Sequence, residues 1–256
     1  MARNGETTFK LVEAKDFQRQ LTAPQQLGVA RLLRESVQAD FPERPDAEIA
    51  EFCGYVDGMR HNPNTRVGGP LLRPKQAYRN AQHVLAIRGD EVVAHLPVAD
   101  NASSNRPGIL GAAEIQGKLH FKDAFGKDWL GHRYLWLGYA AIGPQLRQEL
   151  PDEPSNVATD LDVMLALGGM RHEERQPVST YPWIQEDHWT AALASVGMEP
   201  ETGYSEPVYA FGPNAAPATQ EHWQIQTNEQ MWRNIMNKEG GEAAVDQAIH
   251  QLGQSY

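Results

Sequence analysis

Several side chains in the middle of the chain have types that could move protons in a reaction. Glu114 lies in the mostly apolar stretch Gly-Ala-Ala-Glu-Ile, where burial would favour its neutral form. Tyr139 lies within an apolar run, Tyr181 within Ser-Thr-Tyr-Pro-Trp, and His188 at the expected start of a helix. Groups of these types serve as general acids and bases. Plainer interpretations stay open: a carboxylate at a sheet edge, core tyrosines and a surface histidine.

Signatures of other reaction classes are missing from the sequence. His120 and His132 are further candidate bases, and His83 and His95 could face each other across a hairpin, but no third metal ligand accompanies them. Cys53 is the single cysteine, which excludes an internal disulfide and any cysteine-rich metal site. The chain lacks the nucleophile elbow, the Walker loop and the Rossmann glycine run. We therefore expect no metal and no tightly bound cofactor.

Charge is unevenly distributed along the acidic chain. The net charge is −10, from 23 basic and 33 acidic side chains, which disfavours nonspecific binding to nucleic acid. The segment 58–89 nevertheless contains no acid and is basic through Arg60, Arg66, Arg73, Lys75, Arg79 and Arg88. This segment is either a solvated surface or a local anion site. Acidic residues between Glu149 and Asp162 favour a cationic or zwitterionic small molecule nearby.

The order of expected elements predicts an α+β protein with a mixed sheet. Strands are expected at 7–12, 83–87, 92–98, within 109–121, and at 133–142, 177–184 and 207–211. Helices are expected at 24–37, 47–59, 157–170, 186–196 and 222–252, the last broken at 240–241. Gly89-Asp90 is a hairpin turn signal, and the run 133–142 is apolar on both faces, as in a central strand.

No apolar run approaches the roughly 20 residues that a bilayer span needs, and the first residues lack the apolar core of a secretory signal. We therefore expect a cytoplasmic protein that does not enter a membrane. A small-residue linker at 213–219 suggests two parts: a domain at 1–212 and a helical extension at 213–256. Trp223, Met231 and Trp232 in that extension predict packing against the body or a homodimer contact.

Residues 186–212 carry a family resemblance. A short helix ends in Val196-Gly197-Met198-Glu199-Pro200, followed by a strand, which resembles the end of GCN5-related N-acetyltransferases (GNAT). The hairpin 83–98 and the strand 133–142 occur in the order that this family requires. The resemblance implies a GNAT-like fold, a small-molecule amine acceptor, and acyl-CoA held near the end of the central strand. Ile142 and Arg147 would then contact the donor.

Two departures from the family pattern leave the donor open. The residues after Ile142 lack the glycine-rich loop that binds the pyrophosphate of acyl-CoA, and Arg147 is the one cation close by. Leu193 stands where many members have a tyrosine acid. The donor is therefore either acyl-CoA bound in an unusual way or aminoacyl-tRNA, whose phosphates would contact Arg73, Lys75 and Arg79. A third alternative is a catalytically silent binding module of the same fold.

Overall fold

The computed structural model describes residues 6–13, 16–61, 81–102, 133–170, 172, 174, 177–180, 182–208, 210–212 and 214–254. The strands are β1 (Thr7–Glu13), β2 (Ala81–Arg88), β3 (Glu91–Ala102), β4 (Arg133–Leu137), β5 (Ala141–Ile142), β6 (Val178–Thr180), β7 (Glu199–Val208) and β8 (Ala218–Ile225). The helices are α1 (Phe17–Gln20), α2 (Ala23–Asp40), α3 (Asp46–His61), α5 (Pro144–Arg147), α6 (Asp160–Gly169), α7 (Asp187–Ser195), α8 (Asn228–Met236) and α9 (Gly241–Gln254).

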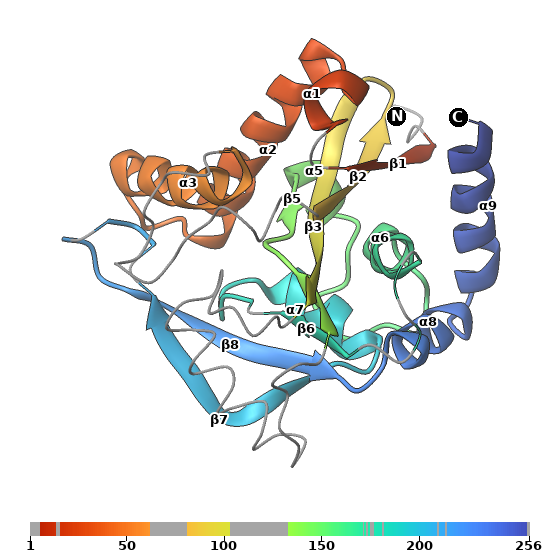
Figure 1. The fold of residues 1–256 in the computed structure, drawn as a ribbon. Helices are drawn as coiled ribbons and strands as arrows, with labels where there is room; N and C mark the ends of the chain where they lie inside the picture. The colour runs from red at the N-terminus through yellow and green to blue at the C-terminus, as the bar shows by residue number, and fades with distance from the viewer. Residues whose placement is uncertain are drawn as a thin grey trace.

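One mixed sheet runs through the molecule in the order β1-β2-β3-β4-β6-β8-β7, with β5 paired to β3 (Figure 1). Neighbouring strands are antiparallel except β4 and β6, which are parallel. The expected α+β class with a mixed sheet is therefore confirmed. The hairpin turn between β2 and β3 is also confirmed, with Gly89 at a φ of 61°.

The two faces of the sheet carry different helices. Val84 and Ala86 of β2 belong to the core that contains α6 to α9, whereas Leu85 and Ile87 belong to the core formed with α2 and α3. This alternation follows from the two-residue repeat of a strand. Figure 1 shows α2 and α3 on one side of β2 and β3, and α6 and α9 on the other.

The central strand is interrupted, which corrects the expected continuous strand at 133–142. Val98 of β3 lies opposite Leu137, and His95 lies opposite Ala141. Leu137 and Ala141 are four residues apart, whereas their partners Val98 and His95 on β3 are three residues apart. Residues 138–140 therefore contain one extra residue, which is a β-bulge. A side chain at Gly138 would place its Cβ 2.7 Å from Cγ of Pro97, so the bulge is packed tightly.

The bulge separates the central strand from its parallel neighbour. β6 pairs with β4 over Leu135–Leu137, whereas β5 pairs with β3 and with no other strand in the described part of the chain. The strands β5 and β6 therefore diverge beyond this point. Residues 138–142 lie at the divergence, and the short helix α5 begins directly after them.

The helix expected at 222–252 is wrong for its first residues. Residues 218–225 form β8, which lies between β6 and β7 in the sheet, and the helices α8 and α9 follow. The polar residues around His222, Trp223 and Ile225 hide the strand pattern in the sequence. A boundary after residue 212 would separate β7 from β8, although these two strands pair. The strand expected at 207–211 is the end of β7, and residues 109–121 lie outside the described residues.

A buried polar chain joins β6, β8 and β7. His222 makes hydrogen bonds of 2.8 Å with Oγ of Ser179 through Nε2 and of 2.8 Å with the Glu201 carboxylate through Nδ1. Ser179 and His222 have no exposed surface. Each strand contributes one member, so the chain fixes the relative position of the three strands.

Gly138→Ala should destabilise the protein by about 1–3 kcal/mol, because the new methyl group has no room beside Pro97. Gly54→Ala is the matched control. Gly54 lies in α3 with nothing within 4 Å of the position that a methyl group would take, so this substitution should stabilise the protein by about 0.5–1 kcal/mol. Urea unfolding of both variants measures the difference. Equal effects at the two positions would show that the bulge tolerates a side chain.

Candidate active site

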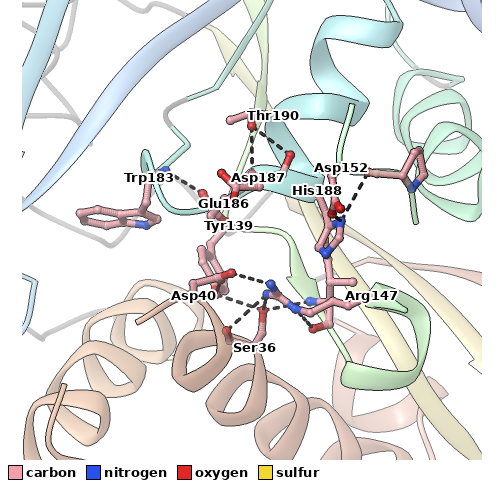
Figure 2. A network of polar contacts seen from close by, with 12 residues as sticks. Ser36, Asp40, Tyr139, Arg147, Asp152, Trp183, Glu186, Asp187, His188 and Thr190 are labelled. Atoms are coloured by element: carbon pink, nitrogen blue, oxygen red, sulfur yellow. Dashed lines mark hydrogen bonds and ion pairs between the residues drawn. The ribbon is translucent and has the colours of Figure 1, made fainter. Parts of the chain in front are cut away.

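A polar network lies where the central strand is interrupted (Figure 2). Ser36 and Asp40 come from the last turns of α2, Tyr139 from the bulge, and Arg147 from α5. Thr22 caps α2 through its side chain and α5 begins at Pro144, so local signals fix the first residue of each helix. The network thus joins three segments that are distant in sequence.

Asp40 and Arg147 form the central ion pair of this network. Nη1 of Arg147 lies 2.6 Å from Oδ1 of Asp40, and the two side chains are 15% and 1% exposed. Nε of Arg147 donates to the carbonyl of Ile142 at 2.9 Å, and Nη2 donates to Oγ of Ser36 at 2.9 Å. Burial raises the pKa of Asp40, and the guanidinium of Arg147 counteracts this shift.

The direction of the hydrogen bonds around Tyr139 follows from the partners. Its hydroxyl donates to Oδ2 of Asp40 at 2.7 Å and lies 3.1 Å from Oγ of Ser36. Oγ of Ser36 already accepts from the N–H of Ile142 and from Arg147, so its own proton donates to the Tyr139 oxygen. Burial and the neighbouring Asp40 charge raise the pKa of Tyr139 well above 10, which keeps the phenol neutral.

Glu186 is a buried carboxyl beside this network. It precedes α7, is 3% exposed, and accepts a hydrogen bond of 2.7 Å from the backbone N–H of Trp183 through Oε2. Oε1 is buried with no hydrogen-bond partner in the described part of the chain. Burial first, and then the negative charge of Asp40, raise the pKa of Glu186 well above 4.5. Glu186 therefore holds a proton well above the ordinary range of a carboxyl group and can donate it to a reacting group.

Aromatic side chains pack behind the ion pair. Ring centroids lie 5.2 Å apart for Phe52 and Trp183, 5.6 Å for Phe52 and Tyr139, and 4.8 Å for Phe41 and Phe211. These rings exclude water from one side of the network, which strengthens its electrostatic interactions. Trp183 is 2% exposed and belongs to this core.

A small pocket lies between the loop before α6 and the helix α7. Its volume of about 10 Å³ has room for about one water molecule, and it is lined by Leu150, Pro151, Ser155, Thr159, His188, Ala191, Ala192, Ser195 and Lys238. His188 is 18% exposed at its side chain and lies 3.3 Å from Oδ1 of Asp152. The expected site residue His188 is therefore at this pocket, and its Nδ1 also lies 3.4 Å from the carbonyl of Pro151.

The structure brings together some of the predicted residues. Tyr139, Ile142 and Arg147 share the network. The sequence predicts that Arg147 contacts the donor, but in the structure its guanidinium is directed inward and pairs with Asp40. The remaining predicted residues lie outside the described residues, and their roles stay predictions: Glu114, Tyr181, Arg73, Lys75, Arg79, His120 and His132.

The site contains residues that sequence reasoning missed. Ser36, Asp40 and Glu186 carry no motif, because Asp40 looks like an ordinary acid near a helix end and Glu186 like an ordinary helix cap. Their importance comes from burial, which depends on packing between distant segments. The predicted pairing of His83 with His95 is confirmed, with 2.8 Å between Nδ1 and Nε2.

Glu149, the first of the acidic residues between 149 and 162, has a fixed partner. Its two oxygens accept from Arg88 at 2.7 Å each, and Arg88 also contacts Asp160 at 3.0 Å. Arg88 lowers the pKa of Glu149. The charge of Glu149 is therefore balanced, and Arg88, one cation of the basic segment, is engaged within the protein.

Metal-ligand clusters and membrane-spanning helices do not occur among the described residues. No group of three or more candidate metal ligands lies together there. No helix in this part of the chain is both long and apolar enough to span a membrane.

Comparison with solved structures finds acyltransferases. A probable acetyltransferase from Staphylococcus epidermidis ATCC 12228 is 10% identical, with a TM-score of 0.42 over 87% of this chain and 99% of that one. FeeM, an N-acyl amino acid synthase from uncultured soil microbes, is 12% identical, with a TM-score of 0.45 over 87% of this chain and 92% of that one. The PaiA N-acetyltransferase from Thermoplasma acidophilum, solved with coenzyme A, is 7% identical, with a TM-score of 0.41 over 84% of this chain and 98% of that one.

No family model and no curated protein matches the sequence. At such low similarity we carry neither substrates nor site residues from the matched structures to this chain.

Arg147→Met should destabilise the protein by about 3–5 kcal/mol, because it leaves the Asp40 carboxyl buried without its cation. Arg31→Met is the control, since Arg31 and Glu91 form an exposed pair at 2.7 Å that contributes less than about 1 kcal/mol. Adding Asp40→Asn to Arg147→Met should recover part of the loss. Urea unfolding that gives equal losses for the two arginines would contradict the central role of the buried pair.

Glu186→Gln should gain stability relative to the wild type as the pH rises. The raised pKa means that the stability contributed by protonated Glu186 is complete below about 4.5 and is lost as pH rises toward the folded-state value. Glutamine cannot ionise, so the difference in Tm between variant and wild type should grow as the pH rises above about 4.5. The exposed Glu43→Gln serves as the control. A pH-independent difference for Glu186→Gln would show that the carboxyl ionises normally.

Proposed function

We propose that the protein transfers an acyl group from a thioester to the amine of a small molecule. The observation that carries this proposal is the buried carboxyl of Glu186 beside the bulge at residues 138–140, where β5 diverges from β6. An uncharged acid with an unpartnered oxygen can take part in proton transfer once a substrate lies against it.

Amide formation from a thioester needs two proton transfers. As the amine nitrogen attacks the carbonyl carbon, a C–N bond forms, and collapse of the intermediate breaks the C–S bond. Glu186 gives its proton to the leaving sulfur and then takes the excess proton from the new ammonium nitrogen, so it ends as it began. The hydroxyl of Tyr139 takes no part in these proton transfers, because it donates its proton to Asp40. Its role is to hold the network next to Glu186 in position. Holding both reactants close supplies much of the remaining acceleration.

A thioester on a flexible arm is the donor that the described residues favour. Arg88 of the basic segment is engaged by Glu149 and Asp160, which weakens the case for tRNA phosphates at that residue. We therefore place acyl-CoA first and aminoacyl-tRNA second.

The acceptor is proposed to be a cationic or zwitterionic amine. The charges of Asp40 and Arg147 cancel and Glu186 is uncharged, so this network carries no excess positive charge to repel an ammonium group. The acidic residues between 149 and 162 act in the same direction over a longer range.

The test is release of free thiol from a series of acyl-CoA thioesters mixed with small amines. Wild-type protein should release thiol in an amine-dependent way, and Glu186→Gln should lower kcat by about 10²–10⁴-fold, the range of a single acid or base. Glu229→Gln, about half exposed on α8, should retain the wild-type rate.

Other outcomes point to the alternatives. Salt-sensitive binding of aminoacyl-tRNA without thiol release from any acyl-CoA would replace the donor. Wild-type protein that neither turns over acyl-CoA nor binds tRNA would be a silent binding module, and the proposal would be wrong.

A further inference from the structure

We propose that Ser179 and His222 take up the proton that the ammonium form of the acceptor loses before its nitrogen attacks the thioester. This inference rests on the proposed function, in which Glu186 begins and ends each turnover protonated. An alkylammonium group holds its proton up to about pH 10, and its nitrogen has no lone pair for attack until that proton has left. One proton per turnover therefore needs an acceptor other than Glu186.

His222 has the hydrogen bonds of a histidine that acts as a base. The carboxylate of Glu201 only accepts, so Nδ1 of His222, at 2.8 Å, carries the proton of the neutral ring. Nε2 is then the acceptor, and it lies 2.8 Å from the hydroxyl of Ser179. In this order of groups the imidazole takes the proton of the hydroxyl, and the carboxylate stabilises the imidazolium that forms.

The buried polar chain lies on the face of the sheet that carries the candidate active site. Ala218 of β8 belongs to the core formed with α2 and α3, whereas Trp223 and Ile225 belong to the core on the other face. Because side chains alternate along a strand, His222 lies on the same face as Ala218. Asp40 joins the polar network from α2, on this face of the sheet.

The strand β8 also brings the polar chain close to Glu186. Oε2 of Glu186 accepts from the N–H of Trp183, and Trp183 pairs with Gln220 of β8. His222 follows Gln220 by two residues, which is about 7 Å along a strand. The proposed acid and the proposed base are therefore anchored at neighbouring positions of one strand.

Ser179 and Gln224 offer acceptor oxygens to an ammonium group. These residues lie opposite each other in the pairing of β6 with β8. Oε1 of Gln224 is buried with no hydrogen-bond partner in the described part of the chain. The hydroxyl of Ser179 donates to His222 and keeps lone pairs that can accept. An ammonium group supplies donors to both oxygens, whereas a carboxylate or a phosphate supplies none.

The far end of the polar chain reaches solvent. Ser179 and His222 have no exposed surface, whereas the side chain of Glu201 is 11% exposed. Ser179 receives the proton of the ammonium group and passes its own to Nε2, and Glu201 stabilises the imidazolium. The proton returns to water after the products leave, so each amide formed from an ammonium group releases one proton.

The thiol-release assay with acetyl-CoA tests this inference with pairs of amines that differ little in size but strongly in basicity, such as ethylamine and trifluoroethylamine. At about pH 7 ethylamine is protonated, whereas the fluorinated amine is neutral and needs no base before attack. His222→Gln should lower kcat/KM for ethylamine about 10²–10⁴-fold and change the value for trifluoroethylamine far less. The loss for ethylamine should shrink as the pH rises toward about 10, where free amine is present in solution.

Two further variants keep the test decisive if His222→Gln disturbs the fold. Glu201→Gln keeps an acceptor for Nδ1 and removes the charge that stabilises the imidazolium, and Ser179→Ala leaves the contact between His222 and Glu201 in place. Each should also slow ethylamine more than trifluoroethylamine. His250→Gln, exposed on α9, is the matched control and should react with both amines as the wild type does.

A structural role alone would slow both amines equally. Equal losses for the two amines in all three variants would overturn the proton transfer and leave the proposed function intact. An acetyl ester on Ser179, detected by mass spectrometry when the amine is omitted, would also overturn it, because Ser179 would then be a nucleophile. Wild-type protein that releases no thiol with any amine would overturn the proposed function together with this inference.

Discussion

The ion pair between Asp40 and Arg147 is the interaction on which the rest of the site depends. It joins the end of α2 to α5, and through Ser36 and Ile142 it also holds the strand segment that follows the bulge. Because the pair lies out of water, its charges act strongly on their neighbours. The negative charge of Asp40 raises the pKa of both Tyr139 and Glu186. A contact that positions the backbone therefore also sets which nearby groups carry a proton.

Several elements of the fold could be predicted from sequence because their signals are local. The Gly89-Asp90 turn needs a glycine that tolerates a positive φ, and α2 begins where Thr22 can cap it. The hairpin then fixes which residues face each other, so the contact of His83 with His95 follows from strand alternation. Fold class could be inferred for the same reason, since it depends on the order of elements and not on their contacts.

The candidate site could be predicted in part, because most of its properties arise from packing. Tyr139 and Arg147 can be identified from their place beside the central strand, but the apolar run gives no sign of the bulge between them. That bulge depends on Gly138 against Pro97, a contact between strands. Burial distinguishes Asp40 and Glu186 from other acids, and no periodicity in the sequence reports it.

Leu193, which stands where many members of the resembled family have a tyrosine acid, is a core residue in this chain. Leu193 has no exposed surface and packs among the apolar residues beneath the sheet. In the proposed mechanism the proton comes instead from Glu186, at the opposite end of the same helix. A change of this kind moves the acid from one end of α7 to the other while the helix keeps its place in the core.

The two edges of the sheet differ, and this limits how copies of the protein can associate. In the described part of the chain, β1 forms one edge and packs beside α9, whereas β7 forms the other. β7 contains Pro200 and Pro207, which lack the N–H groups that a strand from another molecule would need. Joining sheets edge to edge is therefore disfavoured at β7, which protects a long sheet against growth into fibrils.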